Sequence, residues 1–235
     1  MTDRPPVLVV DDNFDNTEII ARYLGARGYP ITVAHDGDEA LALFEQVRPS
    51  LVLLDVMMPG RDGWEVCRLM RQHPVLGKRV RIIMVTALDE WDDKRQALQT
   101  GADDYVSKPF KAKELIARIR TRLRRLPEES ESETLRIGDL AISVNGHSVK
   151  RNGVPIQLTP LEFDLLLALA RRPWQVFSRE VLLEQVWGYR HAADTRLVNV
   201  HVQRLRSKIE RDPEHPEIVV TVHGIGYKAG DTSPR

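Results

Sequence analysis

The chain has 235 residues, which suits one large domain or two of ordinary size, and its 42% hydrophobic content lets each half bury a core. The single cysteine, Cys67, excludes an internal disulfide, and its place in the helical pattern WEVCRLM favours a small core side chain over a catalytic thiol. No stretch approaches the length of a membrane span and the N-terminus has no apolar run of signal-peptide length, so we expect a cytoplasmic protein without a membrane partner.

The net charge of zero hides a difference between the two halves. Residues 1–134 carry a formal charge of −3 and residues 135–235 one of +3. At the end of the first half, residues 124–134 (RRLPEESESET) have Leu126 as their only apolar side chain, so they cannot bury a core and are typical of a linker. We therefore expect two domains with different partners, although a charge of +3 is by itself weak support for nucleic-acid binding.

The first half alternates short apolar runs with amphipathic helical stretches. Leu41, Phe44 and Val47, for example, keep to one face of a helix. This alternation predicts an α/β fold with a doubly wound, five-stranded parallel sheet. The strands expected are 7–12, 31–34, 51–56, 81–87 and 104–109.

Five chemically notable side chains fall at the carboxyl ends of these strands. Asp11 and Asp12 end the first strand, Asp55 ends the third, Thr86 the fourth and Lys108 the fifth. Ligands bind parallel sheets at this edge, where three carboxylates repel one another unless a hard cation such as Mg²⁺ joins them. Lys108 and Thr86 can stabilise a phosphoryl group in transfer, and a carboxylate nucleophile would then become an aspartyl phosphate. One aspartate after a strand is usually a turn residue, but these three aspartates, the threonine and the lysine, all at the correct strand ends and in order, are a strong signal.

The motifs VLVVDDN, LVLLDVMMPGRDGWEV, IIMVTA and GADDYVSKPF resemble the receiver domain of two-component response regulators over residues 5–123. The resemblance implies that Asp55 accepts a phosphoryl group from a sensor histidine kinase, with Thr86 and Lys108 completing the catalytic set. The implied Mg²⁺ ligands are Asp12, Asp55 and the Met57 carbonyl, with Asp11 acting largely through water.

The same resemblance implies a switch pair and a cis peptide bond. The Thr86 hydroxyl would move to the phosphoryl group, and the Tyr105 ring would swing inward behind it. Taken alone, Tyr105 is better explained as a half-buried strand aromatic. Lys108 would pair with the phosphoryl group, and its bond to Pro109 would be cis.

After the linker, the pattern changes to short strands followed by helices. The strands expected are 135–144, 147–153 and 154–158, joined by turns at Asn145-Gly146 and Asn152-Gly153. The helices expected are 159–170, 178–186 and about 195–210, followed by a hairpin over 218–229. Thr159, Pro160 and Glu162 carry the signature of a capping box at the start of the first helix.

The third of these helices has an apolar face and a polar face. The apolar face, expected to contact the core, consists of Val198, Val202, Leu205 and Ile209. The opposite face has the residue types that read base edges: Arg for guanine, Asn or Gln for adenine, and an apolar group for the thymine methyl. Its members are Arg196, Asn199, Val200, Gln203, Arg204 and Ser207. A solvent-exposed helix would also explain this face, but the hairpin that follows has a Gly-rich tip and favours a winged helix that enters the major groove.

The motifs LTPLEFDLLLALA, VFSREVLLEQVWG, DTRLVNVHVQRLRSKIE and TVHGIGYKAG resemble the effector domain of the OmpR/PhoB family of response regulators, and residues 186–206 are most similar to its MtrA-type members. The resemblance implies a receiver domain at 1–123 and an α+β winged-helix domain at 135–231. The implied partners are double-stranded DNA, a sensor histidine kinase, a second copy of the chain when phosphorylated, and RNA polymerase. The implied DNA contacts are Arg196, Asn199, Val200, Gln203, Arg204, Arg206, His223 and Lys228.

The family resemblance also implies a dimer face on the receiver domain. Ion pairs between two copies would join Lys94 to Glu114, Asp104 to Arg118 and Asp103 to Arg125, around an apolar patch of Leu98 and Ile116. Surface charges at such places are more often only solvated. The sequence departs from the family at Arg95, where that face usually has an aliphatic residue, and at His223, where the wing usually has Arg. We therefore expect weak dimerisation and weak binding by the wing.

Two other functions remain open on the sequence. A DNA-binding protein whose receiver domain only dimerises would not need the complete set of strand-end residues. An enzyme controlled by a receiver domain would need a catalytic or metal constellation in the second half. The dispersed histidines His191, His201 and His223 suggest neither, so we expect that the chain is not an enzyme.

Overall fold

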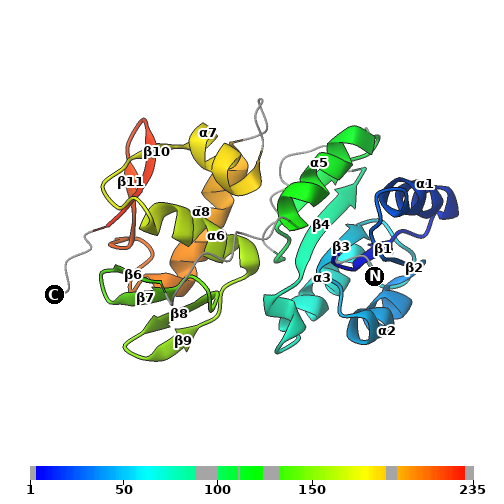
Figure 1. Cartoon of the computed structure of the whole chain (residues 1–235), viewed down its shortest axis with the longest axis horizontal. Helices are drawn as coiled ribbons and strands as arrows, with labels where there is room; N and C mark the ends of the chain where they lie inside the picture. The colour runs from blue at the N-terminus through cyan, green and yellow to red at the C-terminus, as the bar shows by residue number, and fades with distance from the viewer. Residues whose placement is uncertain (1–3, 88–99, 111, 124–132, 189–194, 231–235) are drawn as a thin grey trace. The chain divides into compact units, whose positions relative to one another are not determined.

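The computed structural model describes residues 4–87, 100–110, 112–123, 133–188 and 195–230 (Figure 1). It divides into two compact units, Met1–Arg124 and Arg125–Arg235. Most of the expected linker, residues 124–132, lies outside the described residues. In the part of the chain that is described, no helix is both long and apolar enough to cross a membrane.

The first unit contains the expected five-stranded parallel sheet, with strand order β2-β1-β3-β4-β5. Its strands are β1 (Val7–Val10), β2 (Ile31–Ala34), β3 (Leu51–Asp55), β4 (Arg81–Thr86) and β5 (Asp104–Ser107). Four of the five strands end earlier than the sequence predicted. Their last predicted residues lie just beyond the strands, at the carboxyl edge of the sheet, where the backbone N–H groups of Asp11, Val56 and Lys108 still donate to the neighbouring strands.

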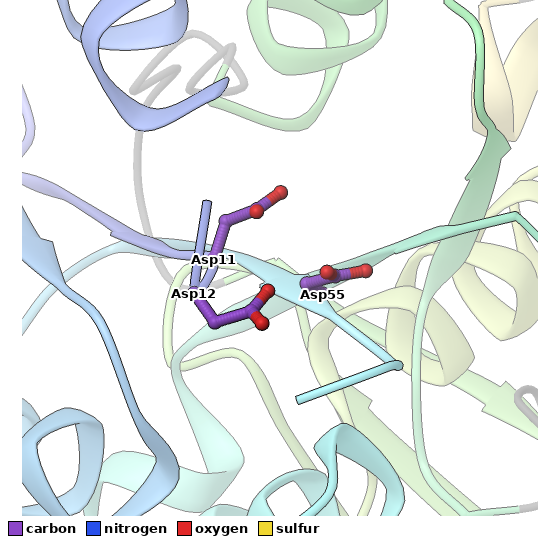
Figure 2. Close-up of side chains that lie close together, drawn as sticks. All are labelled: Asp11, Asp12 and Asp55. Atoms are coloured by element: carbon purple, nitrogen blue, oxygen red, sulfur yellow. The ribbon is translucent and has the colours of Figure 1, made fainter. Parts of the chain in front are cut away.

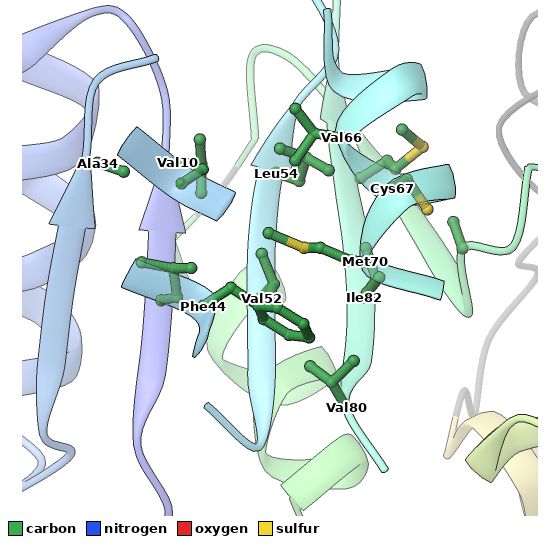
Figure 3. Close-up of a cluster of buried hydrophobic side chains, with 14 of the residues drawn as sticks. Val10, Ala34, Phe44, Val52, Leu54, Val66, Cys67, Met70, Val80 and Ile82 are labelled. Atoms are coloured by element: carbon green, nitrogen blue, oxygen red, sulfur yellow. The ribbon is translucent and has the colours of Figure 1, made fainter. Parts of the chain in front are cut away.

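Helices cover both faces of this sheet because successive strand residues point to opposite sides. Val7 and Val9 of β1 pack with α1 (Phe14–Gly25) and α5 (Ala112–Leu123), whereas Leu8 and Val10 pack with α2 (Gly37–Val47) and α3 (Gly63–Gln72). Figure 3 shows the second of these clusters, in which Phe44 of α2 and Met70 of α3 lie over the strands. Cys67 is buried there, as the helical pattern predicted. A short 3-10 turn, η1 (Leu76–Lys78), precedes β4.

The second unit has two antiparallel sheets. The first has the order β6-β7-β8-β9, with strands β6 (Thr134–Ile137), β7 (Leu140–Ser143), β8 (Ser148–Arg151) and β9 (Val154–Ile156). The segment 135–144 is therefore not one strand but a hairpin, because Gly138 adopts φ +54° and turns the chain. The second sheet has the order β10-β12-β11, with strands β10 (Phe177–Ser178), β11 (Val219–Val222) and β12 (Gly226–Ala229). Strand β10 was not predicted. It pairs so closely with β12 that a Cβ added at Gly226 would meet the Phe177 carbonyl oxygen.

The three helices that the sequence predicted for this unit are all present among its described residues. They are α6 (Pro160–Ala170), α7 (Arg179–Leu182), which continues as the π-helical turn η2 (Leu183–Trp187), and α8 (Arg196–Ile209). The capping box of α6 is present: the Thr159 hydroxyl accepts from the Glu162 backbone N–H, and the Glu162 carboxylate accepts from the Thr159 N–H. The predicted apolar face of α8 is fully buried.

Candidate functional site

Three carboxylates meet at the carboxyl edge of the parallel sheet (Figure 2). Asp11 and Asp12 follow β1, and Asp55 ends β3, the neighbouring strand. Each offers a carboxylate oxygen within 4.8 Å of the others. Asp11 and Asp55 are buried and Asp12 is exposed, so the cluster opens to solvent on the side of Asp12. Their charges repel unless cations offset them.

Lys108 supplies one such cation from the end of β5. Its Nζ donates to Asp11 Oδ2 at 2.8 Å and to Asp55 Oδ2 at 2.9 Å. Burial opposes the charge of this ammonium, but the hydrogen bonds and charges of the two carboxylates outweigh it and raise the pKa of Lys108. The lysine is therefore held in its charged form. The predicted cis bond between Lys108 and Pro109 is present.

Asp55 is a buried carboxylate with only one of its two oxygens hydrogen-bonded among the described residues. Burial raises its pKa, against the lowering effect of the Lys108 hydrogen bond. Its Oδ1 is buried and has no hydrogen-bond partner among the described residues. A buried carboxylate oxygen without a partner is costly, and one lysine cannot neutralise three carboxylates. The possible ligand atoms are all carboxylate oxygens, and the cluster keeps an excess of negative charge. It therefore fits a hard divalent cation.

Two residues that the sequence reading missed support Asp11. The Asn16 amide donates to Asp11 Oδ1 at 3.1 Å and to Oδ2 at 3.2 Å, and the Asn13 backbone N–H donates to Oδ1 at 3.0 Å. Asn13 is also the N-cap of α1, and this capping signature was the available signal. Gly63, at the start of α3, lies so close to the end of β3 that an added Cβ would meet the Asp55 carbonyl oxygen at 2.1 Å.

The remaining predicted receiver residues surround this cluster. Thr86 is buried at the end of β4, and its carbonyl oxygen accepts from the Lys108 backbone N–H at 2.6 Å. Met57 follows β3, and its backbone N–H is a minor influence that lowers the pKa of Asp55. Tyr105 on β5 is half-buried against the core on the α2 and α3 side. The switch roles of Thr86 and Tyr105 and the metal role of the Met57 carbonyl stay predictions.

The expected dimer face is described only in part. Lys94, Arg95, Leu98, Arg125 and the Glu114 side chain lie outside the described residues.

The described members of that face are engaged within their own unit. Asp103 is fully buried and accepts from Arg71 at 2.7 Å and from the Ile82 N–H at 2.8 Å, and its part in a dimer face stays a prediction. Asp104 is also fully buried and pairs with Arg118 of the same chain at 3.3 Å. Ile116 is buried in the core beside α1.

The outward face of α8 is narrower than the helical pattern suggested. Arg196, Gln203 and Ser207 are exposed and Asn199 is half-buried. Val200 is only 7% exposed, so its predicted place on the outer face was wrong. Although Val200 lies away from the apolar face of α8, other parts of the fold cover its side chain.

The basic side chains that flank this face are tied to the rest of the unit. Arg204 and Lys208 lie 3.1 Å and 2.6 Å from the buried Glu162 carboxylate. Burial alone would raise the pKa of Glu162, but the charges of these two cations lower it. On the other flank, Arg206 donates from Nε to the Val219 carbonyl oxygen at 2.9 Å.

The turn between β11 and β12 forms the predicted wing. His223 is exposed in this turn, and Lys228 is half-buried on β12. Their contacts with DNA stay predictions.

Comparison with known proteins agrees with both units. Residues 7–120 match the family model described as response regulator receiver domain, and residues 153–229 match the one described as transcriptional regulatory protein, C terminal. The DNA-binding response regulator MtrA of Mycolicibacterium smegmatis and that of Mycobacterium tuberculosis are each 56% identical over 97% of this chain and 98% of their own length.

Solved structures of full length are also similar. DrrB of Thermotoga maritima, an OmpR/PhoB homologue, is 30% identical with a TM-score of 0.52, and covers 97% of this chain and 100% of its own. A mutant of RitR is 27% identical with a TM-score of 0.71, and covers 97% and 99%. A receiver fold with a strand-end acidic cluster, followed by a winged helix, defines a response regulator. The chain belongs to the OmpR/PhoB family of two-component response regulators, a family of transcription factors rather than enzymes.

Proposed function

We propose that this chain is a transcription regulator whose binding to double-stranded DNA is controlled by phosphorylation of Asp55. The observation that carries the proposal is the Lys108 ammonium, which bridges Asp11 and Asp55 beside a buried, unpartnered Asp55 oxygen. An Asp55 oxygen attacks the phosphorus of a phosphohistidine on a sensor kinase. The P–O bond forms as the P–N bond breaks, and the imidazole nitrogen leaves with the electron pair.

Mg²⁺ is the cation that we propose for the acidic cluster. Asp12, Asp55 and the Met57 carbonyl would hold it directly, and Asp11 would act largely through water because Asn16 and Lys108 already occupy its oxygens. When bound, the ion neutralises charge on the phosphoryl oxygens. Lys108 neutralises the same charge from the other side, and the Thr86 hydroxyl would bond to the phosphoryl group, with Tyr105 following it inward.

The second unit would bind DNA through α8 and the wing. The relatives at 56% identity are named as DNA-binding, and the outward stripe of α8 carries donors suited to base edges. The contacts that we propose are Arg196, Asn199, Gln203, Arg204, Arg206, His223 and Lys228. Phosphorylation would favour a homodimer, and bound dimers would contact RNA polymerase. We place the receiver domain at 1–123, the linker at 124–134, the effector domain at 135–231 and the regulator in the cytoplasm, where the DNA and the polymerase are.

The test combines phosphorylation with DNA selection. The full chain with Mg²⁺ is incubated with and without acetyl phosphate and used to select fragments from a genomic library. Sedimentation follows its mass. We expect acetyl phosphate to shift the mass toward a dimer and to increase recovery of a defined fragment set. Selection that is equally strong in both conditions, with no change of mass, would favour a DNA-binding protein that does not depend on phosphorylation.

A further inference from the structure

The carbonyl oxygen of Asn199 is already bound within the second unit. Asn199 lies on α8, and its Oδ1 accepts hydrogen bonds from Arg179 Nε and from the Tyr227 hydroxyl, each at 2.9 Å. A guanidinium can only donate, so the atom that faces Arg179 must be the oxygen and the amide nitrogen must point away from it. Within the described residues, the Nδ2 of Asn199 has no hydrogen-bond partner.

The two donors are held in place by the wing. Tyr227 belongs to β12 and is 6% exposed. The guanidinium carbons of Arg179 and Arg206 lie 5.4 Å and 5.6 Å from the centre of its ring. Arg206 is anchored in turn to the Val219 carbonyl oxygen of β11. Turning the Asn199 amide over would place its NH₂ group against the Arg179 guanidinium, which can only donate, so Arg179 fixes which end of the amide faces outward and the Tyr227 hydroxyl adds a second hydrogen bond to the oxygen.

We propose that Asn199 contacts bases only as a hydrogen-bond donor, and therefore selects guanine or thymine rather than adenine. This inference rests on the proposed function, DNA binding through α8. In the major groove, guanine offers two acceptors, N7 and O6, and thymine offers O4. Adenine sets a donor beside its acceptor, and cytosine offers a donor. Asparagine recognises adenine through both its oxygen and its nitrogen, and here the oxygen is occupied.

Tyr227 is then a positioning residue, which acts on base choice through Asn199 from the wing. Asn199→Asp keeps the oxygen that Arg179 and Tyr227 bind, and replaces the outward NH₂ with an acceptor. The preferred base at the contacted position should change from guanine or thymine to cytosine or adenine, with a change in the preference ratio of about tenfold. Tyr227→Phe removes one of the two bonds but keeps the ring, and should relax the discrimination against adenine at that same position.

The test is selection of binding sites from a random duplex library by the full-length wild type, Asn199→Asp and Tyr227→Phe. Asn152→Asp, the same chemical change in the exposed turn between β8 and β9, is the matched control and should select the wild-type sequence. Support is a single position that holds guanine or thymine for the wild type and changes as stated in both variants.

Three results would overturn the inference. One is adenine at the position that Asn199→Asp alters. Another is an equal loss of affinity by Asn199→Asp on all sequences. The third is a Tyr227→Phe variant that selects the same sequence as the wild type. This result decides the question even if Asn199→Asp does not fold. A wild type that selects no sequence at all would overturn the proposed function as well, so the two failures are distinguishable.

Discussion

The two units of this regulator arrange their charged side chains in opposite ways. In the first unit, Asp11, Asp55 and Lys108 come from three different strand ends and converge on one largely buried point with an excess of negative charge. In the second, the charges of a single helix are separated: Arg204 is held on one flank by Glu162 and Arg206 on the other by β11. A cluster with excess negative charge suits a small cation and a phosphoryl group. On α8, the held arginines on either side leave the outward face of the helix exposed, which suits a long partner such as DNA.

The largest expected effect is in the convergent cluster. Lys108→Met removes the cation that bridges Asp11 and Asp55, so both the resting carboxylates and the transferring phosphoryl group lose its compensating charge. Labelling of the chain by acetyl phosphate with Mg²⁺ should slow by about 100-fold. Lys78→Met, which changes an exposed lysine of η1 in the same unit, is the control and should label at the wild-type rate. Equal rates for the two variants would show that Lys108 has no part in transfer.

A smaller effect is expected at the anchor of α8. Glu162→Gln keeps the capping hydrogen bond but removes the carboxylate that Arg204 and Lys208 share, so the second unit should lose roughly 2 kcal/mol of unfolding free energy at pH 7. Because folding lowers the pKa of Glu162, its stabilisation is full above the ordinary carboxyl pKa and is lost as the pH falls through the lowered one.

Urea unfolding of both proteins at pH 7 and at decreasing pH measures this difference. The gap in unfolding free energy should narrow below about pH 4.3. Glu214→Gln, an exposed substitution, is the control. A gap that stays constant with pH would mean that the ion pairs of Glu162 do not stabilise the fold.

The smallest effect is expected at the wing. His223 is exposed in the turn between β11 and β12, and histidine carries less positive charge than arginine near neutral pH. His223→Arg should raise affinity for a selected duplex and steepen the dependence of log K on log salt by up to about one unit. Salt titrations of the two proteins on one duplex measure the slopes, and identical slopes would place the wing tip away from DNA.

The sequence predicted the first site well because topology alone brings the ends of parallel strands together. Alternating elements identified the sheet, and Asp11, Asp55 and Lys108 then had to lie near one another. It missed Asn16, because nothing in a single sequence shows that an amide in the first turn of a helix reaches back to Asp11.

The outward face of α8 was harder to predict. Helical periodicity identifies the residues that a helix buries against its main core, and Val198 and Val202 are buried accordingly. Periodicity does not show which side chains of the helix other elements cover, so Val200 was wrongly predicted to be on the outer face. Nor can it show that Glu162, Arg179 and Tyr227 occupy side chains of α8, because those contacts join residues 20 to 46 positions apart.

The most direct test of the account is the site of phosphorylation. Full-length wild type and Asp55→Asn are incubated with Mg²⁺ and acetyl phosphate, and intact mass and acid-labile phosphate are measured. Asp55 contributes the unpartnered oxygen beside the Lys108 ammonium, so we predict one added phosphoryl group on the wild type and none on Asp55→Asn, with both proteins folded by circular dichroism. Equal labelling of Asp55→Asn would contradict the account, because the phosphoryl group would then be carried outside the strand-end cluster.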